Sequence, residues 1–470
     1  MATNATFEAV TATSRLSSRL YNAVWRWHFY AGLYVVPFLL MLAITGLIML
    51  WVNALDGREG ERGFRVAPQA TPLAVSALGE AARAAVPDGV LTQYLSPKAP
   101  DLAALFRVDR GEDAQMVAVD PFTGSVLGQW PRRAGWYDFA ETIHGTLMLG
   151  TVGDGLIEIA AGFGIVLILT GLYLWWPRQG EGVASALLPN LGLRGRAWWK
   201  SLHRSMGFWI AAILLVFLLS GLSWTGVWGA KFVQAWSTFP AEKWDNVPVS
   251  DETHAAMNHG GIKEVPWALE QTPMPASGSP AGSAGIAAGV PVDLDGVAAF
   301  ARAAGLSGRF QIALPKGEAG VWTISQDSMS GDGPDPTSDR TVHLDRYTGK
   351  VLADVRYADY TLGGKAMAVG VALHEGDLGW WNVAFNTAFC LAVIFLAVSG
   401  VVMWWRRRPA GAGRLVAPPR PSGLPMWQGV TAAALLVSIA FPLTGLALLA
   451  VLTVDMLVVQ KVPRLRRAFA

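Results

Sequence analysis

The sequence predicts a mainly α-helical membrane protein with a four-helix transmembrane core, two small α+β modules outside the membrane and a hydrophobic C-terminal extension. Three observations predict this fold: an apolar composition, five long apolar stretches and an internal duplication. Of the 470 residues, 52% are hydrophobic and 15% are charged, whereas charged residues make up about 25% of an average soluble protein. Such a chain cannot cover itself with polar surface, which excludes a purely soluble enzyme.

Five stretches are long and apolar enough to cross a membrane core of about 30 Å, which takes about 20 helical residues. They are residues 28–52, 144–176, 203–228, 374–405 and 427–459. The first is too long for a signal-peptide core and no cleavage pattern follows it, so we expect a retained anchor. The last contains Pro442 and leaves two alternatives, a single crossing or a hairpin bent at this proline.

Short basic segments predict the orientation. Arginine and lysine are concentrated, almost without acidic residues, in residues 1–27, 177–202 and 406–426. Because basic flanks stay in the cytoplasm, residues 53–143 and 229–373 are expected outside. A single crossing by the last stretch would place the basic tail 460–470 outside, against this rule. The net charge of +2 is too small to suggest a nucleic-acid partner.

The two halves of the chain repeat each other. Identical spacings separate a histidine, a glycine one turn later and a second glycine in the first and third spans, which carry His28, Gly32 and Gly46, and His203, Gly207 and Gly221. In the second and fourth spans, His144 and His374 precede a small hydroxyl residue with glycine and then a tryptophan pair. The plan is therefore two copies of helix, outside module and helix.

The outside modules also resemble each other. Both contain the pattern Asp-x-x-Thr-Gly-x-Val-Leu, at 120–127 and at 345–352. Periodicity predicts a helix followed by strands in each module, with helices at 74–86 and 294–304 and strands at 115–119, 321–326 and 341–344. Residues 274–291, rich in proline, glycine and serine, are expected to be a flexible connector.

Four of the seven histidines stand at the starts of the four repeated spans. In the predicted orientation, His28 and His203 form a pair at the cytoplasmic edge, and His144 and His374 form a pair at the outer edge. A haem iron takes two axial ligands from opposite faces, and imidazoles can supply them. Two stacked haems would carry electrons across the bilayer.

Neighbouring residues fit the same hypothesis. Gly32 and Gly207 would let a flat macrocycle approach the backbone, and Gly46 and Gly221 could do the same or allow close helix packing. Arg26 and Arg204 could pair with haem propionates, or they could simply be positive-inside anchors.

Other interpretations of the histidines stay open. Each could be an amphipathic interface residue with a solvated tip, and the glycines could serve only helix packing. Zinc or copper at a histidine pair is possible, but two ligands leave a tetrahedral site half-filled.

Several further residues of the sequence could bind a metal or carry a function. His254, Met257, His259 and Met274 offer soft ligands for copper, but a solvated loop is the simpler interpretation, and we expect His343 to be an ordinary strand residue. Asp154, Glu158 and Asp455 are ionisable groups in or near lipid and therefore functional candidates. The single cysteine, Cys390, excludes an intramolecular disulfide and a cysteine-ligated iron–sulfur cluster. The sequence has no P-loop and no dinucleotide-binding glycine pattern, so electrons would come from a cytoplasmic partner or from quinol.

The motif Trp25-Arg-Trp-His28-x3-Gly32, the block 170–178 and the repeated Asp-x-x-Thr-Gly turns resemble the PepSY-associated transmembrane proteins over about residues 20–408. These are iron-regulated proteins of the bacterial inner membrane. The resemblance implies PepSY-like periplasmic modules and two b-type haems held by His28, His144, His203 and His374. It also implies reduction of periplasmic ferric-siderophores, which would make the chain an oxidoreductase.

Two features depart from the shortest reductases of this family, the long connector and the hydrophobic tail after residue 425. They leave the substrate open. The alternatives are a non-enzymatic membrane-anchored regulator or binding protein, and a haem wire that serves copper or a periplasmic redox partner.

Overall fold

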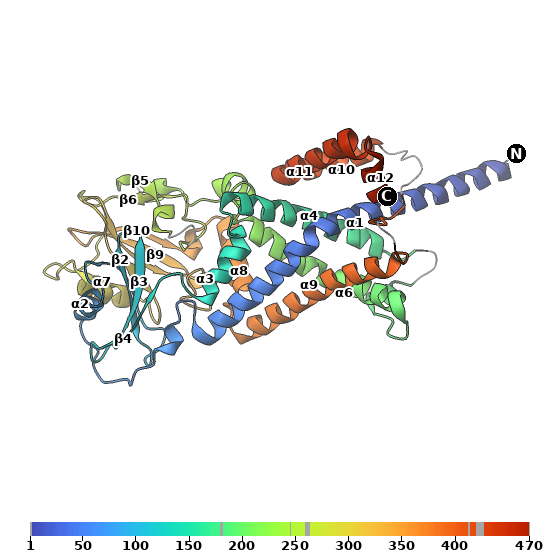
Figure 1. The fold of residues 1–470 in the computed structure, drawn as a ribbon. Coiled ribbons are helices and arrows are strands. Elements are labelled where there is room, and N and C mark those ends of the chain that lie inside the picture. The colour runs from blue at the N-terminus through green and yellow to red at the C-terminus, as the bar shows by residue number, and fades with distance from the viewer. Residues whose placement is uncertain are drawn as a thin grey trace. The chain divides into compact units, whose positions relative to one another are not determined.

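A computed structural model describes residues 2–178, 182–244, 246–258, 264–411, 414–419 and 427–469. The chain divides into two compact units (Figure 1). We call them the helical unit (residues 1–45, 143–232 and 387–470) and the sheet unit (residues 46–142 and 233–386). Both units draw segments from each half of the chain, so the duplication does not coincide with the division into units.

Long apolar helices identify the chain as a membrane protein. Five described helical segments have the length and composition to cross a membrane, and they match the five predicted spans in order. The long helices are α1 (Ala2–Asp56), α4 (Thr151–Trp175), α6 (Gly195–Leu222), α9 (Trp380–Arg407) and α11 (Pro442–Val454). Shorter helices are α3 (Trp136–Thr146), α5 (Val183–Leu187), α10 (Trp427–Ala440) and α12 (Pro463–Ala468).

Small residues let the long helices of the helical unit pack closely. Helix α4 presents Gly164 to Leu218 of α6, where an added methyl group would lie only 3.0 Å from the leucine. Helices α1, α6 and α9 meet in a cluster around Ala43, Ile210 and Phe389. Because lipid is as apolar as these side chains, close van der Waals packing of this kind holds membrane helices together.

The last apolar stretch forms a hairpin, the second of the two predicted alternatives. Helices α10 and α11 lie side by side (Figure 1) and are separated only by the non-helical Phe441. Pro442 occupies the first turn of α11, where its missing N–H removes no helical hydrogen bond. The tail after α11 returns to α1, where the Tyr30 hydroxyl donates to the Phe469 carbonyl at 2.9 Å. The basic tail therefore lies at the end of the helical unit where α1 carries its own basic residues.

The sheet unit contains one antiparallel sheet to which both halves of the chain contribute. Its described strands follow the order β10-β9-β8-β7-β1-β2-β3-β4. Their bounds are β1 (Val90–Leu95), β2 (Ala104–Arg110), β3 (Asp113–Val119), β4 (Val126–Pro131), β7 (Gln311–Ala313), β8 (Val321–Gln326), β9 (Arg340–Asp345) and β10 (Val351–Arg356). A separate pair is formed by β5 (Val249–Thr253) and β6 (Pro273–Pro275).

The two predicted modules are not separate bodies. Strand β1 of the first module pairs with β7 of the second, with Tyr94 opposite Ile312. Each four-stranded sheet would otherwise leave an unpaired edge, and joining the edges satisfies their backbone groups. The two predicted small modules thus share one joined sheet.

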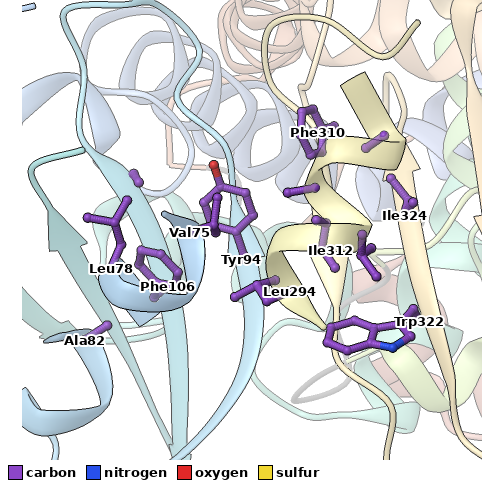
Figure 2. Close-up of a cluster of buried hydrophobic side chains, with 14 of the residues drawn as sticks. Val75, Leu78, Ala82, Tyr94, Phe106, Leu294, Phe310, Ile312, Trp322 and Ile324 are labelled. Atoms are coloured by element: carbon purple, nitrogen blue, oxygen red, sulfur yellow. The ribbon is translucent and has the colours of Figure 1, made fainter. Parts of the chain in front are cut away.

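One hydrophobic core crosses this junction (Figure 2). Helix α2 (Val75–Ala85) brings Leu78 to the core, and helix α7 (Leu294–Ala303) brings Val297. Tyr94, which lies on the junction strand β1, is 2% exposed, and its ring is 6.3 Å from that of Phe310. The predicted helices at 74–86 and 294–304, and the three predicted strands, are confirmed.

The repeated turns have matching geometry. Asp120 and Asp345 each accept backbone N–H bonds from the residues two and three positions later. Gly124 and Gly349 follow with φ of 73° and 67°, the left-handed conformation that glycine adopts without strain.

The predicted flexible connector is fixed to strand β10. Ser283 exchanges two backbone hydrogen bonds with Val351. A side chain at Gly285 would collide with the carbonyl of Gly349, so the glycine permits the approach of the two backbones.

Candidate functional site

His28 lies on α1 and contacts α4. Its Nδ1 is 2.9 Å from the hydroxyl of Thr170. The imidazole lies over Gly171, where an added methyl group would be 3.3 Å from its Cε1. Thr170 and Gly171 of α4 thus both contact the imidazole of His28 from α1.

His203 repeats this arrangement in the second half of the chain. It lies on α6, and its Nδ1 is 2.7 Å from the hydroxyl of Ser399 on α9. A methyl group at Gly400 would be 3.8 Å from its Cε1. The His28 and His203 side chains are close enough to interact electrostatically, so the helical unit brings together the first predicted pair.

His144 makes the same type of contact from a different position. Its Nδ1 is 2.9 Å from the hydroxyl of Thr45 on α1. The sequence predicts His144 at the start of the second long helix, but in the structure it lies in the last turn of α3. The chain breaks after Thr146 because Leu147 and Met148 adopt positive φ, and α4 begins only at Thr151.

His374 is also displaced from the start of its predicted span. It lies in the last turn of α8 (Leu362–Glu375), which Gly376 ends in the left-handed conformation. The Asn386 side chain donates to the His374 carbonyl at 3.0 Å, a contact that the sequence did not indicate. His144 belongs to the helical unit and His374 to the sheet unit, and their pairing stays a prediction.

Among the candidate glycines, Gly32 and Gly207 lie at ordinary contact distance from leucine side chains, and Gly221 lies beside open space. A methyl group at Gly32 would lie 3.9 Å from Leu167, and one at Gly207 would lie 3.9 Å from Leu396, so the repeat extends to this contact. At Gly221 a methyl group would meet nothing within 4 Å. Gly46 is half-buried on α1. This space fits a flat ring system and equally fits a lipid chain.

The candidate arginines bind protein oxygens. Arg204 donates to the carbonyl of Trp175 at 3.0 and 3.2 Å and so caps the end of α4. Arg26 donates to the carbonyl of Pro418 and to the Tyr30 hydroxyl. These contacts explain both residues without a cofactor, and their pairing with propionates stays a prediction.

The carboxylates of α4 bind the chain after α6. Asp154 accepts from the backbone N–H of Gly226 at 2.9 Å, and Glu158 accepts from those of Val227 and Trp228. Glu158 is only 2% exposed. Both carboxylates therefore accept backbone N–H groups, while Oε1 of Glu158 is buried without a hydrogen-bond partner among the described residues. Asp455 accepts from the side chain of Gln460 at 2.7 Å, which is a local contact.

The sheet unit holds a buried histidine pair that the sequence interpretation missed. His254 is 1% exposed rather than part of a solvated loop, and its Nε2 is 2.9 Å from Nε2 of His343. Its Nδ1 donates to the Thr272 carbonyl at 2.7 Å, so Nε2 of His254 must accept from His343. The Thr323 hydroxyl then donates to Nδ1 of His343 at 3.0 Å. Both imidazoles are neutral and fully bonded, and His259 lies outside the described residues.

We expect the histidine pair to make the chain less stable in acid. Burial lowers the pKa of His254 from 6.5 to about 4, and burial together with His254 lowers the pKa of His343 further. Between these values the unfolded chain binds more protons, so the free energy of unfolding should fall as pH drops from 6.5 towards 4. The loss should be about 3 kcal/mol for His254.

Denaturant unfolding of the full chain in detergent, followed by tryptophan fluorescence over this pH range, measures the effect. The double variant His254→Gln, His343→Gln should show a flatter profile, because all carboxyl groups titrate in both proteins. Identical profiles would contradict the assignment of acid sensitivity to this pair.

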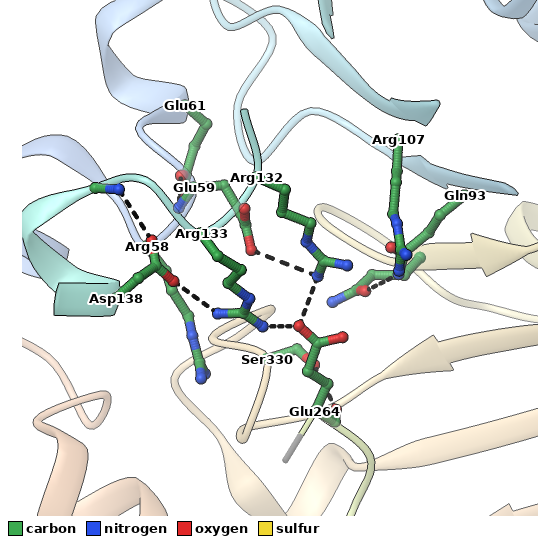
Figure 3. Close-up of polar contacts among 12 residues, drawn as sticks. Arg58, Glu59, Glu61, Gln93, Arg107, Arg132, Arg133, Asp138, Glu264 and Ser330 are labelled. Carbon is green, nitrogen blue, oxygen red and sulfur yellow. Dashed lines mark hydrogen bonds and ion pairs between the residues drawn. The ribbon is translucent and has the colours of Figure 1, made fainter. Parts of the chain in front are cut away.

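A second unforeseen feature is a network of buried ion pairs in the sheet unit (Figure 3). Arg132 binds Glu264 at 2.7 Å, and Arg133 binds Asp138 at 2.9 Å. Arg309 binds Glu61 at 3.2 Å. The network surrounds a cavity of about 20 Å³, which has room for little more than water. Burial and the neighbouring Asp327 carboxyl group raise the pKa of Asp332 to about 8.

The structure therefore defines a membrane protein of duplicated architecture, in which helices carry repeated histidine–hydroxyl contacts and a joined antiparallel sheet forms a second unit. The profile of the PepSY-associated TM region matches residues 25–407. The chain belongs to this family. No curated protein matches the sequence.

Proposed function

We propose that the chain is a b-type di-haem protein of the bacterial inner membrane that passes electrons outward to ferric-siderophores in the periplasm. The observation that supports this proposal best is the His28–His203 pair. Two imidazoles from different helices lie near each other, and each has its Nδ1 engaged by a hydroxyl group. Nε2 is then the nitrogen left for a metal.

The donor set suits haem better than a bare metal ion. The porphyrin of haem supplies four nitrogen ligands to the iron and leaves two positions for protein ligands. Zinc, in contrast, needs at least three protein ligands. Among the described residues, no group of three or more histidine, cysteine or carboxylate side chains could hold a metal ion. Neutral imidazole pairs fit the two axial positions of haem, and the open space at Gly221 fits a flat macrocycle.

The proposed path has one haem at each edge of the membrane. His28 and His203 would hold the haem on the cytoplasmic side, where a partner protein or quinol supplies electrons, and His144 and His374 would hold the one on the periplasmic side. When bound, haem supplies a one-electron couple. The basic segments favour a cytoplasmic location for the N-terminal end of α1 and for the tail after α11.

Reduction of a ferric-siderophore requires only that the protein deliver an electron to the iron. A siderophore holds Fe(III) through hard, anionic oxygen atoms. One electron converts Fe(III) to Fe(II), whose lower charge weakens these bonds, and the chelator is released unchanged. No protein acid or base is required in this step.

The test uses the full chain, purified after expression with added haem. We expect a b-type reduced-minus-oxidised spectrum and about two haems per chain, as two bis-histidine sites require. After dithionite reduction and removal of excess reductant, Fe(III)-siderophore should reoxidise the protein, and a ferrous chelator should trap one Fe(II) per electron transferred.

The outcomes separate the alternatives. A purified protein without haem would overturn the redox proposal and leave a non-enzymatic regulator. Haem that reduces Cu(II) but no Fe(III)-siderophore would overturn only the substrate and favour the haem wire to copper.

A further inference from the structure

The same contact recurs around three histidines in the described chain. The hydroxyl groups of Thr170, Ser399 and Thr45 lie 2.9, 2.7 and 2.9 Å from Nδ1 of His28, His203 and His144, respectively. Each hydroxyl residue precedes a glycine and lies on a different helix from its histidine. Interface histidines with solvated tips would not be expected to share such a partner.

Each hydroxyl group also lies within hydrogen-bond distance of a carbonyl of its own helix. Thr170 can donate to the Val166 carbonyl at 2.6 Å, and Ser399 to the Leu396 carbonyl at 3.0 Å. Thr45 can donate in the same way to the Met41 carbonyl at 2.8 Å. A hydroxyl group that donates its one proton to a carbonyl offers only lone pairs to the imidazole. This arrangement favours Nδ1 as the protonated nitrogen of each ring.

We infer that Thr170 and Ser399 are positioning residues, which hold the imidazoles of His28 and His203 with Nδ1 protonated and the Nε2 lone pair available for the haem iron. The inference rests on the proposed haem function. A ligating imidazole needs an acceptor at its second nitrogen, which fixes the tautomer and the ring orientation and influences the electron density at the metal. Here threonine and serine take that role.

The glycines that follow Thr170 and Ser399 also contact the imidazoles. The rings of His28 and His203 lie over Gly171 and Gly400. At Gly171 even a methyl group would come within 3.3 Å of the His28 ring, so a larger side chain would displace the ring from the hydroxyl group. In α4 and α9, the hydroxyl–glycine pair therefore contacts an imidazole and is more than a helix-packing motif.

The experiment compares Thr170→Val with Thr170→Ser in the full-length protein. Valine keeps the shape of threonine and removes the acceptor, whereas serine keeps the acceptor. Thr453→Val is the matched control, because Thr453 makes the same backbone bond in α11, to the Leu449 carbonyl at 2.8 Å, and is exposed. The readouts are haem affinity, from titration of haem into the haem-free protein, and the midpoint potential of each haem.

We expect Thr170→Val to weaken one haem site about tenfold or more, as losses of such outer contacts do. The midpoint potential of that haem should shift while the other stays unchanged. Thr170→Ser should restore both properties, and Thr453→Val should leave both haems as in the unmodified chain.

Two failures are distinguishable. An unmodified chain without haem overturns the proposed function. An unmodified chain with two haems, together with unchanged affinity and potential in Thr170→Val, overturns this inference alone. If Thr170→Val does not fold, as judged by thermal melting in detergent, Ser399→Ala tests the equivalent contact of His203 with the same readouts.

Discussion

Replacing His203 with alanine is expected to remove one of the two haems and to leave the other. His203 and His28 come from different helices of the helical unit and would be axial ligands of the same iron. A b-type haem has no covalent bond to the chain, so we expect the one remaining imidazole to hold it too weakly for the haem to stay bound through purification. The haem content per chain, measured as the pyridine haemochrome, should fall by about half.

Double variants sharpen this test. The double variant His28→Ala, His203→Ala removes both proposed ligands of the same haem, so its haem content per chain should equal that of either single variant. Loss across pairs, in His203→Ala with His374→Ala, should remove both haems. His254→Gln is the matched control, because His254 lies outside the repeated set and bonds to Thr272 and His343. Equal haem content in all these variants would contradict the assigned ligands.

Arg309→Ala is expected to destabilise the protein by about 3–5 kcal/mol. The side chain of Arg309 is 3% exposed and lies between Glu61, at 3.2 Å, and Asp332, at 3.4 Å. Without the guanidinium group, the buried Glu61 carboxylate keeps only Lys98, at 3.0 Å, as a counter-ion, and desolvation makes a poorly compensated buried charge costly. Denaturant unfolding in detergent measures the change in the free energy of unfolding.

Arg65→Ala provides the comparison. Its side chain is 70% exposed and pairs with Asp101 on the surface. An exposed pair contributes only about 0–1 kcal/mol because water screens it. If both variants lost the same stability, burial would not be the reason for the effect at Arg309.

Much of the fold follows from local patterns. Hydropathy located all five apolar spans, and alternation located the strand at 321–326 with the bounds that the structure has. The repeated aspartate turns were also visible, because Asp120 and Asp345 act on residues only two or three positions away. Such patterns predict an element well when its cause lies within a few residues.

Features that depend on distant segments were missed or misplaced. The junction of β1 with β7 pairs Tyr94 with Ile312, far apart in the sequence, and no local signal indicates it. The break that puts His144 on α3 comes from positive φ at Leu147 and Met148, which are ordinary helix formers. A solvated loop is the simpler interpretation of His254 from the sequence, whereas in the structure His343 of strand β9 contacts it.

The candidate site divides in the same way. The sequence predicted the four histidines and their glycines from matched spacing alone. It noted the hydroxyl residues beside Gly171 and Gly400 but not their contact with imidazoles, because those contacts join separate helices. The ion-pair network around Arg309 was also invisible, since its members come from several segments.

The sequence by itself determined that this protein lives in a membrane, that it is duplicated and that it belongs to the PepSY-associated family, because hydropathy, charge and repeat spacing add up residue by residue along the chain. Only the tertiary structure decided which atom each imidazole bonds, that both modules share one sheet, and that the last apolar stretch turns back. Those outcomes depend on which distant surfaces fit together, and hydrogen-bond geometry and packing are properties of pairs that no single stretch contains.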